Sequence, residues 1–307
     1  LFLKILRLLP PEIAHKIALD LLSLSHRLGI LSFIFRKPND ENCSFAGMNL
    51  RNRLGTAAGL DKNGDYIDCL GALGFGFLEV GTVTPMPQYG NPKPRVFRNF
   101  NENSIINRLG FNNGGVDRLI KNLRTRSFEG ILGVNVGANK NSKGDERIND
   151  YLHCIEKVHK YADYITVNVS SPNTPNLRNL QSDENLVDLV TKIDKLVNKQ
   201  KIKIPLFLKI SPDESNTIIE DIIEIVKNSS FSGIVATNTT IDKSSLSNIK
   251  YKSIEGGLSG EPLMKKSTKI IKMIDLKADK KIPIIGVGGV MNKDCLLYTS
   301  DAADEAD

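Results

Sequence analysis

Two lysines stand where a charged side chain is unusual, at the end of one apolar segment and inside another. Lys62 closes the segment 53–62, and Lys209 lies amid the apolar residues of the segment 204–213. Removing an unpaired ammonium group from water is costly, so a buried lysine needs a partner. We therefore expect both lysines to face a bound anion or a cofactor that becomes anionic. For either lysine alone, a solvated strand end is the alternative.

Four asparagines occupy comparable positions in successive apolar segments. They are Asn135 in GVNVG, Asn168 in TVNVS, Asn173 in SPN and Asn238 in ATNTT. A carboxamide both donates and accepts hydrogen bonds, which suits a planar heterocycle with alternating carbonyl and N–H groups. One such asparagine alone would fit a turn. Four at strand ends predict a shared binding site.

Two glycine-rich turns predict a phosphate site. Residues 256–260 (GGLSG) precede a helical segment, and residues 286–289 (GVGG) end the last apolar segment. Glycine lets backbone N–H groups approach a phosphate closely, and the late loops of a (β/α)-barrel are its usual phosphate site. No G-x-x-x-x-G-K-[ST] or G-x-G-x-x-G motif follows a first strand, which disfavours nucleotide hydrolysis and dinucleotide binding.

The bulk composition is that of an ordinary globular protein. The 307 residues are 40% hydrophobic and 25% charged, with a mean hydropathy of −0.19, which argues against disorder and against a bundle of membrane spans. A net charge of +6 suits an anionic substrate, an anionic membrane surface or nucleic acid without choosing among them. The four cysteines form no C-x-x-C pair, so we expect no metal site and no disulfide framework, and a reducing cytoplasm fits best.

Most of the chain alternates short apolar segments with helical periodicity, as in 145–162 and 182–199. Strands that alternate with helices predict a parallel sheet. We expect an α/β fold of the (β/α)8 TIM-barrel type, with its functional loops at the carboxyl ends of the strands; a doubly wound sheet is the alternative. The seven expected strands lie in 53–62, 75–85, 130–139, 162–173, 204–213, 231–240 and 282–290.

The two ends of the chain differ from this pattern. Two short apolar helices, separated by Pro10 and Pro11, open the chain, and each is too short to span a bilayer. They predict either an interfacial helix pair or a cap on the next domain. We expect residues 1–40 to form this segment and residues 41–294 the barrel. Residues 295–307 fit neither strand nor amphipathic helix, and we interpret them as a non-native tail in place of the eighth strand.

A series of ordered motifs resembles the quinone-dependent dihydroorotate dehydrogenases, from the N-terminal helices to about residue 290. The resemblance implies the TIM-barrel fold and the oxidation of (S)-dihydroorotate to orotate in pyrimidine biosynthesis. The motifs are AAGLDK at 57–62, EVGTVTP at 79–85, PRVFR at 94–98, NRLGFNN at 107–113, VNVSSPNTPNLR at 167–178, ATNTT at 236–240, GGLSG at 256–260 and IIGVGG at 284–289.

The resemblance also implies a role for individual residues, with FMN over the barrel mouth and dihydroorotate on the flavin. Ser171 matches the catalytic base, which takes a proton from C5 of the substrate while C6 passes a hydride to the flavin. The positions matching FMN ligands are Ala58, Gly59, Thr82, Asn135, Asn168, Lys209, Thr237, Gly260 and Gly289. The positions matching substrate contacts are Lys62, Asn107, Arg108, Leu109, Gly110, Phe111, Asn168, Asn173, Asn238 and Thr239.

Two features indicate the membrane-associated class within this resemblance. Ser171 stands where the soluble class has a cysteine, and the chain has the N-terminal helices that the soluble class lacks. The resemblance implies a membrane quinone as electron acceptor and peripheral contact with lipid on the cytoplasmic face of a bacterial inner membrane, or at the mitochondrial inner membrane. His15 and Arg98 match positions that border the quinone tunnel; for His15, a surface position is the alternative.

Two other functions are compatible with parts of this pattern. A tRNA-modifying flavin barrel of the dihydrouridine synthase type would suit the basic charge, but it uses a catalytic cysteine, and no cysteine here stands at a suitable strand end. A non-catalytic flavin- or phosphate-binding barrel is the second alternative, and the joint presence of Ser171, Lys62 and the asparagines argues against it. We therefore expect no nucleic-acid partner.

Overall fold

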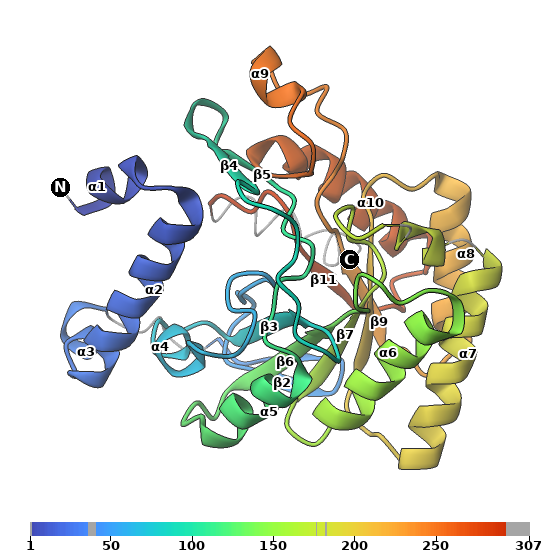
Figure 1. Cartoon of the computed structure of the whole chain (residues 1–307). Helices are drawn as coiled ribbons and strands as arrows, with labels where there is room; N and C mark the ends of the chain where they lie inside the picture. The colour runs from blue at the N-terminus through green and yellow to red at the C-terminus, as the bar shows by residue number, and fades with distance from the viewer. Residues whose placement is uncertain (1, 36–40, 176, 182, 293–307) are drawn as a thin grey trace.

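The computed structural model describes residues 2–35, 41–175, 177–181 and 183–292. Its centre is a parallel sheet that curls into part of a barrel, with helices on the outside (Figure 1). The sheet has the order β11-β9-β8-β7-β6-β3. These strands are β3 (Phe77–Val83), β6 (Ile131–Val136), β7 (Tyr164–Asn168), β8 (Leu206–Ile210), β9 (Gly233–Ala236) and β11 (Ile284–Gly286).

The strand order supports a barrel and excludes the doubly wound alternative. Each strand of the large sheet pairs with the one that follows it in this sheet, and the order never reverses. A doubly wound sheet has a reversal point between its two halves. The parallel sheet expected from the sequence is therefore confirmed, and its residues are almost completely buried because helices cover one face and side chains fill the other.

One expected strand is wrong. The segment 53–62 runs beside β3 but makes only an isolated parallel bridge, between Gly55 and Phe77. Gly59 has a φ of 104°, and the carboxylate of Asp61 accepts hydrogen bonds from the backbone N–H groups of Asp65 and others nearby, so the chain turns here instead of extending. The expected loss of an eighth strand concerns residues outside the described ones.

The outer layer consists of amphipathic helices. The two helices expected at 145–162 and 182–199 are confirmed as α6 and α7, with ends that shift by up to four residues. Their apolar faces and those of their neighbours pack on the sheet and form the main core. The outer helices are α5 (Val116–Thr125), α6 (Gly144–Val158), α7 (Asp183–Gln200), α8 (Asn216–Lys227) and α10 (Met264–Lys277), and the shorter α4 (Ile67–Gly71) packs on β3.

A small hairpin closes the amino-terminal end of the barrel. Its strands are β1 (Cys43–Phe45) and β2 (Met48–Leu50). Met48 and Leu50 pack inside the barrel against a cluster that includes Tyr164 and Phe207, whose rings meet edge to face with centroids 5.6 Å apart. The interior at this end is therefore a filled core, which leaves the carboxyl ends of the strands as the open side.

A second, antiparallel sheet lies beside the carboxyl ends of the strands. It has the order β10-β5-β4, formed by β4 (Val96–Asn99), β5 (Ser104–Asn107) and β10 (Gly257–Gly260). The GGLSG stretch is therefore strand β10, not the turn expected from its glycines. Their absent side chains let it lie close to β5, because a Cβ atom on Gly260 would meet the carbonyl oxygen of Asn103 at 2.2 Å.

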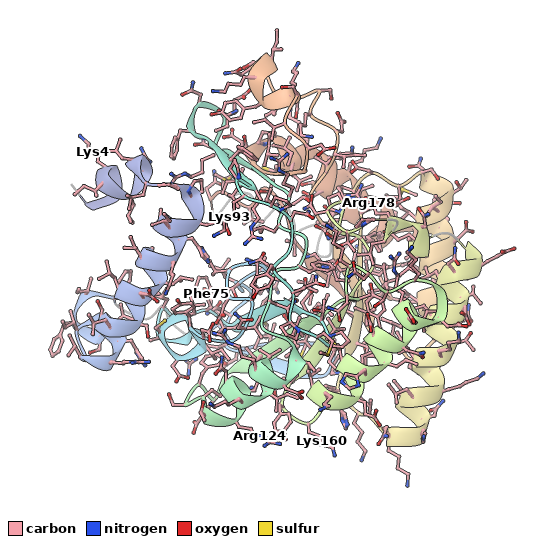
Figure 2. All side chains as sticks on the ribbon, in the orientation of Figure 1. Lys4, Phe75, Lys93, Arg124, Lys160 and Arg178 are labelled. Atoms are coloured by element: carbon pink, nitrogen blue, oxygen red, sulfur yellow. The ribbon has the colours of Figure 1, made fainter. Side chains whose placement is uncertain are left out.

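The N-terminal helices lie at one side of the barrel (Figure 1). They are α1 (Phe2–Leu8), α2 (Pro11–Arg27) and α3 (Leu31–Ile34), and the expected break at Pro10 and Pro11 is confirmed. Among the described residues, no helix has both the length and the apolar character needed to cross a membrane. Figure 2 shows Lys4 on these helices, Arg178 near the carboxyl ends of the strands, and Arg124 and Lys160 at the opposite end.

Candidate active site

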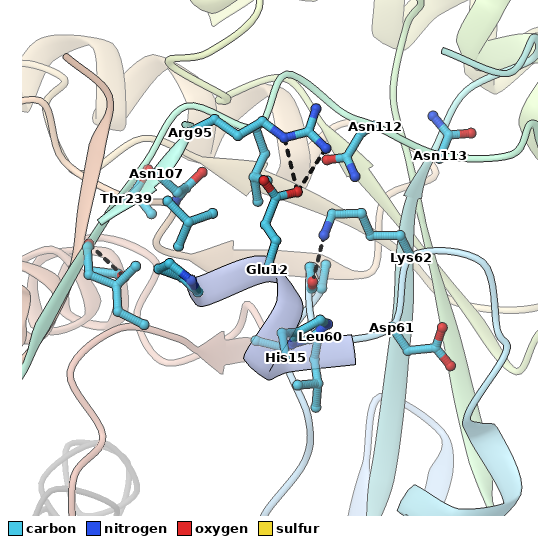
Figure 3. A pocket seen from close by; sticks show the side chains of 18 of the residues that line it. Glu12, His15, Leu60, Asp61, Lys62, Arg95, Asn107, Asn112, Asn113 and Thr239 are labelled. Carbon is cyan, nitrogen blue, oxygen red and sulfur yellow. Dashed lines mark hydrogen bonds and ion pairs between the residues drawn. The ribbon is translucent and has the colours of Figure 1, made fainter. Parts of the chain in front are cut away.

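The candidate site is a cavity of about 1350 Å³ between α2 and the carboxyl ends of the strands, joined by a smaller one of about 130 Å³. Figure 3 shows Glu12 and His15 of α2 facing Lys62 and Arg95. Most expected site residues line one or both cavities. They are His15, Ala58, Gly59, Lys62, Thr82, Arg98, Asn107, Leu109, Gly110, Phe111, Asn168, Ser171, Asn173, Lys209, Thr237, Asn238 and Thr239.

Four expected site residues do not line these two cavities: Arg108, Asn135, Gly260 and Gly289. The guanidinium group of Arg108 donates to the carbonyl oxygen of Pro94, at 3.0 Å from Nη2. Gly260 lies in β10, and Gly289 packs closely on the first residue of α10. Asn135 is fully buried and takes part in the site through hydrogen bonds to its neighbours. The roles expected for these four residues stay predictions.

Lys62 and Lys209 both line this site. Lys209 lies at the end of β8 with a relative exposure of 5%, so the solvated alternative is wrong for it. Burial lowers the pKa of its ammonium group, and the carboxylate of Glu79 opposes this change. Lys62 donates to the carbonyl oxygen of Gly59 at 3.0 Å. Burial and the Arg95 guanidinium lower the pKa of Lys62, while carboxylates such as that of Glu12 raise it.

Three of the expected asparagines form one hydrogen-bonded chain across the strand ends. Asn168 donates from Nδ2 to Oδ1 of Asn135 at 3.2 Å and to Oγ1 of Thr82 at 3.1 Å, while its own Oδ1 accepts from Asn238 at 3.2 Å. Asn173 instead donates to Oδ1 of Asn107 at 3.1 Å. These contacts fix each amide so that defined donors and acceptors border the cavity. Asn168, Asn173 and Asn238 therefore border the smaller cavity and Asn135 supports Asn168, while the shared binding site stays a prediction.

Ser171 lies on the wall of the smaller cavity, in the loop that follows β7. Its relative exposure is 5%, and its Oγ accepts a hydrogen bond from the backbone N–H of Asn173 at 3.3 Å. This contact closes a short turn that fixes the position of the hydroxyl group. Pro172 restricts the backbone within the same turn.

A group of charged side chains holds this loop against the next two strands. These residues were not among those predicted from the sequence. Arg178 donates to the carbonyl oxygens of Ser170 at 3.1 Å and Thr239 at 2.9 Å, and its guanidinium pairs with Asp213 at 2.8 Å. Asp213 also pairs with Lys266 at 2.6 Å. The signal was present, because Arg178 ends the motif around Ser171 and Asp213 ends the segment around Lys209.

A second ion pair joins the N-terminal helices to the side of the site that carries Ser171. Arg95 is almost fully buried and donates to Oε1 of Glu12 at 2.8 Å from Nη2 and 3.1 Å from Nε. Arg95 also donates to the carbonyl oxygen of Asn91 at 3.0 Å, and Asn91 donates to that of Asn173 at 3.2 Å. Helix α2 is therefore connected through side chains to the loop that carries Ser171.

His15 of α2 and Arg98 of β4 both line the larger cavity. Arg98 donates to the carbonyl oxygens of Leu6 and Arg7, at 3.2 Å each, and to that of Leu9, and so binds the carboxyl end of α1. Burial and the Lys62 ammonium lower the pKa of His15, although the Leu60 carbonyl opposes this. A neutral imidazole at neutral pH follows.

These features define a class of protein: a (β/α)-barrel enzyme whose active site lies at the carboxyl ends of its strands. The profile of one family, dihydroorotate dehydrogenase, matches residues 42–301. The chain therefore belongs to the dihydroorotate dehydrogenase family of oxidoreductases, as the resemblance implied. None of the described cysteines, Cys43, Cys69 and Cys154, lines either cavity, so the tRNA-modifying alternative gains no support.

Curated relatives and solved structures agree with this family. The chain is 49% identical over 292 residues to a dihydroorotate dehydrogenase (quinone) of Buchnera aphidicola, covering 94% of this chain and 87% of the relative. A Neisseria meningitidis protein of the same name is 47% identical over 309 residues, covering 98% and 89%. The crystal structure of Eimeria tenella dihydroorotate dehydrogenase in complex with ferulenol is 31% identical, with a TM-score of 0.85 and coverage of 95% and 83%.

The ion pairs of Asp213 predict a pH-dependent loss of stability in Asp213→Asn. Burial alone would raise the pKa of Asp213, but hydrogen bonds from Lys266, Thr240, Ile241 and Arg178 lower it overall. A lowered folded-state pKa stabilises the protein at neutral pH, and this contribution disappears as the pH falls through that value. We expect the variant to lose about 2 kcal/mol of unfolding free energy at neutral pH, and less in acid, measured by urea denaturation.

An exposed pair provides the control for this measurement. Asp188 pairs with Lys192 one turn away on α7, and both side chains are partly exposed. Asp188→Asn should change the unfolding free energy by less than about 0.5 kcal/mol. An Asp213→Asn variant as stable as the wild type at neutral pH would show that Asp213 does not hold the loop.

Proposed function

We propose that the chain oxidises (S)-dihydroorotate to orotate with bound FMN, passes the electrons to a membrane quinone, and so serves pyrimidine biosynthesis. One observation carries this proposal. Ser171, both lysines and the amides of Asn107, Asn168, Asn173 and Asn238 line one small cavity at the strand ends. A proton-accepting group, two cations and fixed amides are what binding and oxidising a planar, carboxylated ring requires.

The residues at the strand ends fit a flavin mononucleotide. No atom lies within 4 Å of a Cβ position built on Gly59, so a flat ring can approach the backbone there. Lys209 provides a buried cation for which the described residues offer no hydrogen-bond partner. When bound, FMN supplies the hydride acceptor and the route for electrons to the quinone. Gly260 and Gly289 are proposed to border its phosphate.

The smaller cavity fits the substrate. Lys62 is placed to pair with the substrate carboxylate, because its ammonium group borders both cavities. Asn107, Asn173 and Asn238 present amides to the same space and can pair with the carbonyl and N–H groups of the ring. Thr239 and the backbone of residues 108–111 are proposed to complete these contacts. Such fixed contacts hold the substrate carbon near Ser171.

Ser171 is proposed as the base that removes the proton from C5 of dihydroorotate. A serine hydroxyl is a weak base, so it needs fixed geometry and a site that excludes water. The loop turn fixes its Oγ, and Arg178 holds the loop on the neighbouring strands. The residues around Ser171 therefore provide the fixed geometry, and the Ser171 side chain itself is buried.

Replacing the base tests this proposal directly. In Ser171→Ala, reduction of the bound flavin by dihydroorotate should slow by roughly a hundredfold to ten-thousandfold, because the proton has no acceptor. Stopped-flow absorbance of the flavin measures this step alone, without the quinone. The amount of flavin bound should not change, because the hydroxyl group faces the substrate side.

Ser171→Cys is the matched control, since a cysteine keeps an ionisable group at the same place. It should retain measurable flavin reduction, with the pH dependence shifted toward lower pH than in the wild type, because a thiol ionises at a lower pH than a serine hydroxyl. Flavin reduction at the wild-type rate in Ser171→Ala would exclude Ser171 as the base.

We also propose that the N-terminal helices bind the membrane surface and admit the quinone. Leu8 and Phe33 have relative exposures of 85% and 91%, and Leu28, between α2 and α3, and Ile34 of α3 are also exposed. Large exposed apolar side chains gathered in one segment are typical of an interfacial helix pair. The larger cavity opens between these helices and the barrel, where His15 and Arg98 lie. Residues 1–40 are thus proposed as a membrane segment and 41–294 as the catalytic barrel.

Phe33→Glu should weaken binding to vesicles that contain anionic phospholipid by about tenfold or more, because it removes apolar area and adds repulsion. Co-sedimentation with the vesicles measures this binding. Val187→Glu is the matched control, because Val187 is an exposed apolar residue on α7, away from the N-terminal helices (Figure 1). Equal vesicle binding by Phe33→Glu and the wild type would contradict the membrane role. Activity toward dihydroorotate with a short-chain quinone should be unchanged in both variants.

A further inference from the structure

Glu79 is a carboxylate inside the barrel that the proposed reaction does not use. It lies on β3 with a relative exposure of 4%. Oε1 accepts a hydrogen bond from Asn135 at 2.9 Å, and Oε2 accepts from Tyr164 at 3.1 Å and Thr166 at 2.9 Å. All three partners are neutral donors, so they satisfy the oxygen atoms without balancing a negative charge.

Lys209 faces the same interior. On β8 it follows Phe207 by two residues, so both side chains lie on one face of the sheet, and Phe207 packs against Tyr164. In the sheet register, Phe207 pairs with Thr166 and Lys209 pairs with Asn168. Lys209 is therefore the next interior residue after Phe207 in the direction of the cavity. The Phe207 ring packs on Tyr164, which is a hydrogen-bond partner of Glu79.

The charged groups around Lys209 are few. Among the described residues, Glu79 is the one charged side chain with an electrostatic effect on the Lys209 ammonium group. Tyr164 is the titratable group that contacts Glu79. Burial, with the carboxylate of Glu79, raises the pKa of Tyr164, which therefore stays a neutral donor. Lys62, the other site lysine, interacts instead with Glu12, Asp61 and Arg95.

We propose that Glu79 is a positioning residue whose buried carboxylate holds Lys209 in its charged ammonium form beneath the cofactor. A lysine removed from water loses its proton unless a nearby anion compensates the lost hydration. The carboxylate compensates the ammonium, and three hydrogen bonds keep the carboxylate in place. The inference rests on the proposed function in one respect, the cofactor-facing role of Lys209.

The consequence for the site is a fixed positive charge. An ammonium group can donate to an electron-rich cofactor ring and attract the negative charge that develops when the ring is reduced, whereas a neutral amine attracts it much less. Glu79 therefore acts on the cofactor through Lys209 without touching it. Asn135, which donates to Glu79, also accepts from Thr82, so the same carboxylate fixes the direction of the amide chain at the strand ends.

The direct test measures the protonation of Lys209 in Glu79→Gln. Glutamine has the same shape and keeps hydrogen-bonding groups for the three partners, but it removes the charge. With ¹³C-labelled lysine in the full chain, the resonance lost in Lys209→Met identifies Lys209, and its chemical shift against pH gives its titration. We expect the titration midpoint to move to lower pH in Glu79→Gln, because the compensating anion is gone. An unchanged midpoint would overturn the proposal.

Tyr164→Phe is the matched control, since it removes one hydrogen bond to Glu79 but keeps the ring and the charge. Its Lys209 should remain protonated over the same pH range as in the wild type. A midpoint lowered as far as in Glu79→Gln would also overturn the proposal, because hydrogen bonding rather than charge would then be responsible. The affinity for FMN should fall about tenfold at neutral pH in Glu79→Gln, by loss of a charged donor, and little in Tyr164→Phe.

The reverse substitution keeps the proposal testable if Glu79→Gln does not fold. In Lys209→Met the buried carboxylate loses its compensating cation, and an uncompensated buried charge is strongly destabilising. Lys209→Met should therefore unfold at a lower urea concentration than the wild type, and adding Glu79→Gln to Lys209→Met should recover part of this loss. A double variant no more stable than Lys209→Met would contradict the pairing. The Lys209 titration and the unfolding free energy are both measured without turnover. They can therefore be interpreted even if the proposed reaction does not occur.

Discussion

The burial of Lys209 at the end of β8 is the constraint on which the rest of the site depends. A lysine in this position needs an anion inside the barrel, and Glu79 lies there with three donors around it. The donors lie on β6 and β7 and Glu79 lies on β3, so side chains of three strands meet at this one buried carboxylate. The filled core below it, closed by the β1–β2 hairpin, excludes water from the same space.

The polar groups of the site lie at the open side of the barrel, and hydrogen bonds connect them to the buried Glu79 carboxylate. Asn135, Asn168 and Asn238 form a chain from the buried carboxylate to the cavity, and Ser171 is the third residue after the strand that ends at Asn168. Arg178 and Asp213 hold the Ser171 loop, while Arg95 connects it to α2. The Ser171 loop and helix α2 are thus connected through side chains, as the proposed passage of electrons from substrate to quinone would require.

The sequence predicted the buried lysine and the converging asparagines because these signals are local. A lysine amid apolar residues, and amides at the ends of successive strands, can be recognised without the fold. Glu79 was not recognised, because its significance depends on side chains from three strands that meet only in the folded barrel. The pair of Glu12 and Arg95 joins residues 83 positions apart, which no local pattern indicates.

Two local signals led to wrong predictions for a physical reason. The segment 53–62 is apolar enough for a strand, but its glycines and the turn at Asp61 allow a backbone that bends beside β3. GGLSG has the composition of a turn, yet its glycines serve close pairing with β5. Glycine permits both outcomes, and the neighbouring chain decides between them.

Flavin reduction measured without oxygen tests the central claim most directly. Dihydroorotate is added anaerobically to the full chain supplied with FMN, flavin absorbance is followed, and a quinone is then added. Dihydroorotate should bleach the flavin, and the quinone should restore its colour. Flavin that stays oxidised in the presence of dihydroorotate, or that is not reoxidised by quinone, would contradict this claim.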